Sequence, residues 1–192
     1  AMDGVGNLAC TDNIFIGTNA GGGGWDTASS AANIGIGSHV MDGVMNDSQE
    51  NTAIGHNAMS ALTLGDQNVA LGAYALGKNT EGTQNAALGG ASLYENLTGS
   101  NNVAIGQDAG RKYAASTAMP ITDNSIFIGH SSRAAGNNQT NQIVIGYDAV
   151  GQGSNTATIG DGNLTEVHMS DDDGAKVFCG ALSTGGAING AW

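Results

Sequence analysis

Basic residues are scarce in this chain: five Lys and Arg stand against 17 Asp and Glu, and the formal net charge is −12 over 192 residues. A body this acidic repels a phosphate backbone, so we expect no nucleic-acid partner. No apolar run approaches the roughly 18 residues of a membrane-spanning helix, so we expect no membrane insertion. The N-terminus shows no charged stretch followed by an apolar one, so no signal peptide is visible, and Ala1-Met2 is interpreted as a cloning remnant.

Residues that carry metal or catalytic chemistry are also few. Cys10 and Cys179 lie near opposite ends, without the spacing of a metal site or a disulfide framework, so we expect free thiols. The four histidines form no HxH or HExxH pair, and no nucleophile motif or phosphate-binding loop is present. We therefore expect no metal, no cofactor, no catalytic residue and no enzymatic activity. A capsule-depolymerising enzyme is an alternative that would need paired carboxylates about 5–9.5 Å apart.

Glycine, by contrast, is abundant, with 32 copies, and nine of them end a short apolar triplet. Four of the eight intervals between these nine glycines are 17 residues long, and a repeat of this length indicates a solenoid. Six triplets follow an Asn, and most are followed, three residues past the glycine, by Ala or Ser. This pattern predicts a short strand that enters a tight corner. The triplets that end at these glycines are 14–16, 34–36, 52–54, 69–71, 86–88, 103–105, 126–128, 143–145 and 157–159.

The repeats divide the chain into a lead-in (1–12), a repeat domain of about nine coils (13–163) and a short C-terminal β segment (164–192). We expect an all-β fold, a parallel β-roll or β-helix solenoid. The 40% hydrophobic content and the regular Ile/Leu placement oppose disorder.

Both faces of each predicted strand are apolar, because the middle residue of the triplet is also small or apolar. We expect one face in the core of the coil and the other against a neighbouring chain. The predicted core residues are the third members, Ile16, Ile36, Ile54, Leu71, Leu88, Ile105, Ile128, Ile145 and Ile159. The predicted interchain residues are Ala53, Ala70, Ala87 and Ala104, so a charge at Ala70 or Ala87 is expected to break the oligomer.

Two irregular stretches are candidate receptor-binding loops. One is the glycine run that ends in Trp25, which also matches one copy of a calcium-binding GGxGxD repeat; a flexible loop is the alternative. The other is Arg111-Lys112-Tyr113, which would suit an anionic sugar or phosphate; a solvated loop with local ion pairs is the alternative. Tyr74, Tyr94 and Tyr147 follow strand glycines, and packing is expected for each rather than ligand stacking.

The repeats NTAIGHNA (51–58), NVALGAYA (68–75) and TGSNNVAIG (98–106) resemble two related groups. One is the head repeat of trimeric autotransporter adhesins, and the other is the similar repeat of bacteriophage tail fibres and tailspikes. The resemblance implies a left-handed parallel β-roll and a homotrimer. Residues 165–178 resemble the segment that precedes an endosialidase-type intramolecular chaperone in phage fibres.

The resemblance therefore implies a phage tail fibre protein, located in the virion, that binds a glycan or an outer-membrane protein on the bacterial surface. The alternatives are a bacterial trimeric adhesin head on the cell surface and a structural fibre spacer without a receptor site. Neither group has a fixed receptor-binding motif, so no binding residue is transferred.

Overall fold

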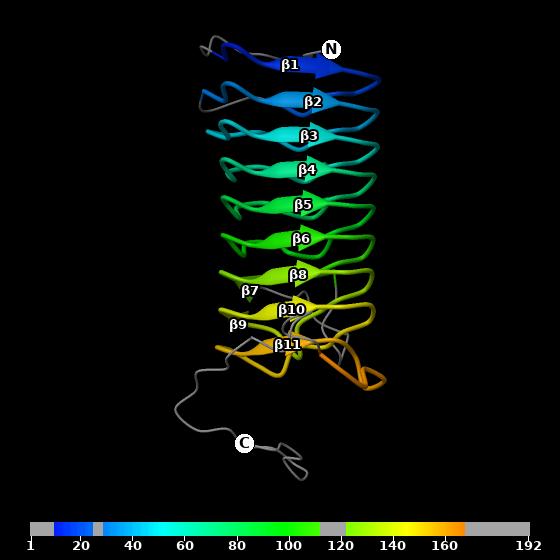
Figure 1. The fold of residues 1–192 in the computed structure, drawn as a ribbon. Coiled ribbons are helices and arrows are strands. Elements are labelled where there is room, and N and C mark those ends of the chain that lie inside the picture. Colours follow the sequence, from blue (N-terminus) through cyan, green and yellow to red (C-terminus); the bar gives the residue numbers. More distant parts are fainter. Residues whose placement is uncertain (1–9, 25–28, 112–121, 168–192) are drawn as a thin grey trace, which may run out of the picture.

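The computed structural model describes residues 10–24, 29–111 and 122–167, and within these ranges the protein is a parallel β-solenoid without helices. Short strands stack above one another in a straight column, with β1 at one end and β11 at the other (Figure 1). No described helix is available to cross a lipid bilayer. The expected all-β solenoid is confirmed. Trp25, Lys112, Tyr113 and Cys179, for which the sequence made predictions, lie outside the described residues.

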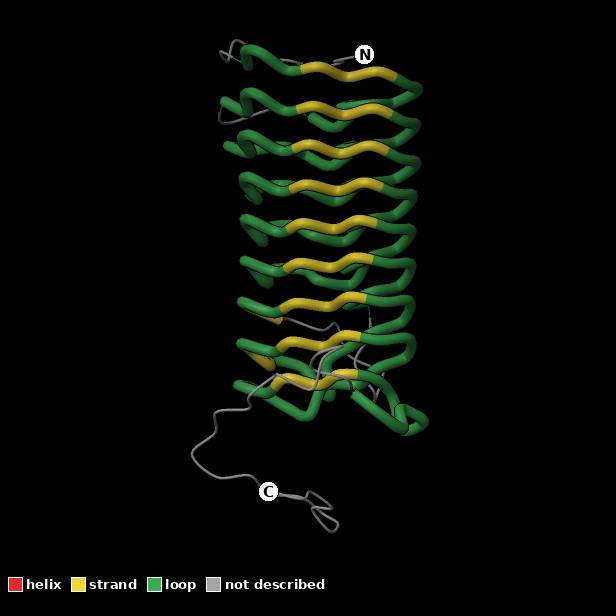
Figure 2. Tube along the Cα trace, viewed as in Figure 1, coloured by secondary structure: helices red, strands yellow, loops and turns green. Residues whose placement is uncertain are grey.

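Nine of the eleven strands form one parallel sheet, and their bounds coincide with the nine predicted triplets. Each strand pairs in register with the next coil, so that Ala53 lies beside Ala70 and Ala70 beside Ala87. Figure 2 shows these strands aligned on one side of the column, with the loops running behind them. The strands of this sheet are β1 (Ile14–Ile16), β2 (Ile34–Ile36), β3 (Thr52–Ile54), β4 (Val69–Leu71), β5 (Ala86–Leu88), β6 (Val103–Ile105), β8 (Ile126–Ile128), β10 (Ile143–Ile145) and β11 (Ala157–Ile159).

The returning half of each coil is mostly turn. A second, two-stranded parallel sheet forms there from β7 (Thr122–Asp123) and β9 (Gln139–Thr140), and Arg133 pairs with Val150 in an isolated bridge. In the other described coils the returns still bond to one another through the backbone, as where the Thr63 amide donates to the Thr80 carbonyl (3.0 Å).

The middle residues of the strands face the interior of the coil, which shows that the sequence-based assignment of the two strand faces was wrong. The alanines predicted to lie between chains, Ala53, Ala70, Ala87 and Ala104, are fully buried within the single chain. A charge at Ala70 would therefore disrupt the coil itself rather than an interchain contact. The predicted core residues point outward: Ile16, Ile54, Leu71, Leu88, Ile105 and Ile159 are 36–58% exposed, and Ile36, Ile128 and Ile145 are half-buried.

The narrowness of the coil explains this reversal. A turn of about 17 residues encloses too little space for two large side chains that face each other, and interiors pack without voids. Here the large interior side chains come from the returning segment, among them Met41, Met45, Met59, Leu62, Leu76 and Leu93. Alanine on the strand leaves room for them, so the larger Ile and Leu side chains occupy the outer face.

A buried ladder of asparagines precedes the strands. Asn33, Asn51, Asn68, Asn85 and Asn102 are 0–1% exposed. At Asn68 the side-chain nitrogen donates to Asn51 Oδ1 (3.0 Å) and to the Gly82 carbonyl (2.8 Å), while Asn68 Oδ1 accepts from the Asn85 backbone and side-chain nitrogens. The ladder ties each strand to the coils on both sides, which explains the recurring Asn of the sequence.

Candidate functional site

The outward face of the main sheet is apolar and exposed. It consists of the first and third residues of the nine main strands, and is called the apolar face below. Its most exposed side chains are Ile14, Ile16, Ile54, Val69, Leu71, Leu88, Ile105, Ile143 and Ile159. These nine alone expose on the order of 700 Å², whereas the largest apolar patch of a monomeric protein usually covers about 300–600 Å². An apolar patch of this size indicates an interaction surface.

The apolar face also carries no charge. None of its positions holds Asp, Glu, Lys or Arg, although the chain has 22 such residues. The face runs from β1 to β11, along the whole described column (Figure 1). Within the described ranges the charged side chains lie in the corners and returns, so covering the apolar face desolvates no charge.

A column of aromatic rings lies at the corners that follow β2 to β5. The rings of His56 and Tyr74 meet edge to face with centroids 5.4 Å apart, and those of Tyr74 and Tyr94 with centroids 6.0 Å apart. His39 extends the column beyond His56, at 6.2 Å. Edge-to-face contacts of this kind hold the rings in defined orientations.

Two basic side chains lie over the last ring of this column. Lys78 Nζ is 5.0 Å from the centroid of the Tyr94 ring, and the Arg111 guanidinium carbon is 5.3 Å from it, which are cation–π distances. Arg111 Nη1 also bonds to Asp108 Oδ1 (2.5 Å), and Arg111 Nε is buried without a hydrogen-bond partner. We call Tyr74, Tyr94, Lys78 and Arg111 the aromatic corner.

The aromatic corner encloses a hollow of about 350 Å³ lined by Tyr74, Ala91, Tyr94 and Arg111. Its volume is at the lower end of the roughly 300–1,000 Å³ found for small-ligand sites. Arg111, the one predicted receptor-binding residue within the described ranges, lies in it. Tyr74 is 41% exposed, and its ring also packs edge to face against His56 and Tyr94, in line with the packing expected from the sequence.

Sequence reasoning did not connect Arg111 with Tyr94, although a signal was present. Gly77, Tyr94 and Arg111 are each 17 residues apart and occupy the same place in successive coils. A side chain at Gly77 would collide with the Tyr94 ring, since its Cβ would lie 2.8 Å from Tyr94 Cε2. The repeat length, read beyond the strands, would have brought these residues together.

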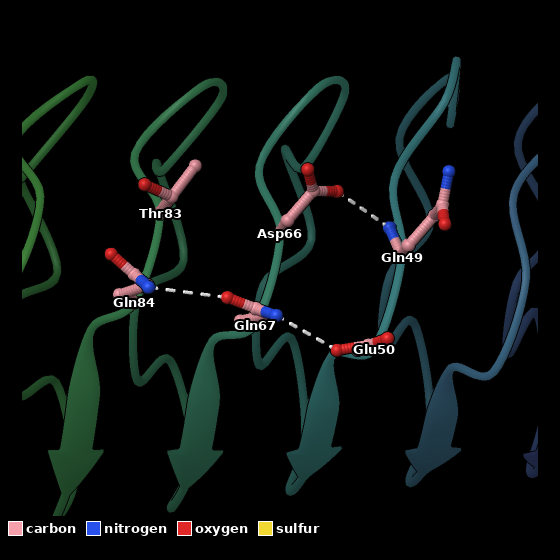
Figure 3. A pocket seen from close by; sticks show the side chains of 6 residues that line it. All are labelled: Gln49, Glu50, Asp66, Gln67, Thr83 and Gln84. Atoms are coloured by element: carbon pink, nitrogen blue, oxygen red, sulfur yellow. Dashed lines mark hydrogen bonds between the residues drawn. The ribbon is translucent and has the colours of Figure 1, made fainter.

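A second hollow, of about 330 Å³, is polar. It is lined by Gln49, Glu50, Asp66, Gln67, Thr83 and Gln84 (Figure 3). Gln84 Nε2 donates to Gln67 Oε1 (3.2 Å), and Gln67 Nε2 donates to Glu50 Oε2 (2.9 Å). Because these side chains bond to one another from coil to coil, we interpret them as a ladder that reinforces the stack.

A third hollow, of about 540 Å³, borders the last described coil and includes Arg133, Asp148, Thr158 and Asp161 in its lining. Arg133 pairs with Asp148. Hydrogen bonds from Asn163 to the exposed Asp161 carboxyl lower the pKa of Asp161 below its ordinary value. The charged pair Arg133–Asp148 is thus satisfied within the hollow, and its lining includes no aromatic residue.

The described ranges contain no group of three or more His, Cys, Asp or Glu residues that could hold a metal ion. We interpret the apolar face and the aromatic corner as the candidate binding surfaces of the described protein. Comparison with protein-family models, curated proteins and solved structures gave no match.

Proposed function

We propose that this chain is a segment of a homotrimeric bacteriophage tail fibre that attaches the virion to the surface of its bacterial host. The observation that carries the proposal is the uncharged apolar face, which runs the length of an otherwise acidic rod. A rod with such a face fits a fibre in which chains lie side by side.

Other copies of the chain are the partners that suit this face best. A partner must present an apolar surface of matching length and with the same repeat along the column, and a copy in parallel orientation does so by symmetry. The exposed apolar area of about 700 Å² per chain, shared between two neighbours, gives each pair of chains a small interface, and the three such interfaces of a trimer act together. Three apolar faces meeting at an axis leave the acidic returns in water.

The choice between fibre types rests on the sequence resemblance of residues 165–178 to the segment that precedes a phage-fibre chaperone. The head of a bacterial trimeric adhesin is the alternative. An export signal or a membrane anchor encoded in the full-length gene would favour the adhesin.

Attachment can be tested with fluorescently labelled protein on a panel of bacterial strains. We expect binding to some strains and not to others, and weaker binding by a variant that cannot trimerise, because three weak sites act together. A trimer that binds no strain in a broad panel would contradict attachment and leave a structural spacer as the role of this segment. Release of reducing ends from bound capsule would instead indicate an enzyme.

A further inference from the structure

We propose that the hollow of the aromatic corner binds an acidic sugar, a hexuronate unit of a surface polysaccharide. The inference rests on the proposed attachment function and gives it a ligand class. All residues that line the hollow belong to one chain, so the site does not need a neighbouring copy.

The hollow exists because one side chain is missing from a column. Tyr74, Ala91 and Asp108 each stand two residues past a strand glycine, at the corners that follow β4, β5 and β6 (Figure 1). Their backbones share the left-handed conformation, with φ of 62°, 54° and 56°. Ala91 leaves a gap between Tyr74 and Asp108, which are two coils, or about 10 Å, apart. The hollow lined by Tyr74, Ala91, Tyr94 and Arg111 lies at this gap.

The walls of the gap suit the two sides of an acidic sugar. The exposed Tyr74 ring offers an apolar surface for the C–H face of a pyranose. Tyr94 holds Lys78 and Arg111 through cation–π contacts, so both cations are positioned beside the gap before any ligand arrives.

The charges of the corner match one carboxylate. Arg111 is paired with Asp108, whereas Lys78 forms no ion pair with any described residue. One positive charge is therefore left uncompensated, in a chain that has only five basic residues. A carboxylate bound in the hollow would compensate this charge through hydrogen bonds. Arg111 Nε is buried without a hydrogen-bond partner, so the donors of this guanidinium are not all satisfied.

The test uses the full chain and two matched probes, tetragalacturonate and its methyl ester, which share a sugar backbone and differ in charge. Isothermal titration should show the acid binding at least tenfold more tightly than the ester, with the difference decreasing at high salt. Lys78→Gln should abolish this preference. Ala91→Tyr should weaken binding of both probes at least tenfold by filling the gap, and Tyr74 shows that this position accepts Tyr at a similar φ.

Tyr147→Ala and Arg133→Gln are the matched controls. Tyr147 is a 70% exposed ring stacked on His130, and Arg133 is another arginine paired with an aspartate, but both lie away from the hollow. Equal effects of control and site variants would overturn the proposal, as would equal affinity for the two probes or no binding at millimolar concentration. Sedimentation of the same samples separates the two ideas, because a trimer without sugar binding rejects only the sugar site and a monomer with sugar binding rejects only the fibre.

Discussion

At the residue scale, the asparagine ladder uses every hydrogen-bonding atom of its buried amides. Asn68→Asp keeps the acceptors that serve Asn85 but replaces two donors with a carboxylate oxygen, which then faces Asn51 Oδ1 and the Gly82 carbonyl. We expect this variant to lose about 3 kcal/mol or more of stability, because a buried charge is left unpaired among acceptors. Urea unfolding followed by circular dichroism at fixed chain concentration measures the loss.

Asn101→Asp is the control for this change, since Asn101 is exposed and lies next to the ladder residue Asn102. Its stability should stay within about 0.5 kcal/mol of the parent. Similar losses in the two variants would show that added charge, and not the ladder, is responsible.

A second residue-scale prediction concerns volume exchange between coils. Gly110 lies four residues past its strand glycine, where neighbouring coils have Leu76 and Leu93. A Cβ there would lie 2.8 Å from Leu93 Cδ2 and 3.0 Å from Cδ2 of the buried Phe127 ring. Phe127→Ala should cost about 3–5 kcal/mol and Gly110→Leu about 1–3 kcal/mol. The double variant should be more stable, by at least about 1 kcal/mol, than the sum of the two single losses predicts.

The backbone allows this exchange, because Leu76 and Leu93 have φ of 50° and 48° and Gly110 has 64°. Phe15, at the other end of the column, provides the control pair. The stability losses of Gly110→Leu and Phe15→Ala should be additive in the control double variant. Additive losses for Gly110→Leu and Phe127→Ala as well would contradict the exchange.

At the element scale, the strands were predictable and their orientation was not. Every main strand coincides with a predicted triplet, because a glycine marks its end and a polar residue, Asn in six cases, precedes its start. Period-two alternation separates two faces but does not say which one points inward. The information lay in the returns, where large residues such as Met59 and Leu76 fill the interior and require Ala opposite them. The aromatic corner was missed for a related reason, because its residues belong to turns.

The corners between elements supply a prediction of increased stability. Ala32 is exposed, stands two residues before a main strand and has the left-handed φ of 57°. In later coils the same position, with the same conformation, is occupied by Asn101, Asn124, Asn141 and Asn155. Ala32→Asn should therefore raise stability by about 0.5–1 kcal/mol, because Asn tolerates this region better than Ala. Thermal unfolding is the measurement. Ala31→Asn, at a neighbour without positive φ, should give no gain, and an equal gain there would refute the explanation.

At the scale of the whole molecule, the apolar face is expected to hold three chains together. Leu71 is 36% exposed in β4, near the middle of the column. Leu71→Lys would place three like charges close to one axis, so we expect dissociation into monomers that keep the β spectrum of the parent. Leu64→Lys is the matched control, because Leu64 is 44% exposed but lies outside the strands. If both variants form trimers, the apolar face is not the surface that holds the chains together.

Sedimentation equilibrium of the unmodified chain tests most directly whether other copies cover the apolar face. The account predicts a single species with the mass of three 19.1 kDa chains, independent of rotor speed and persisting on dilution to micromolar concentration. A folded species with the mass of one chain at every concentration would contradict it.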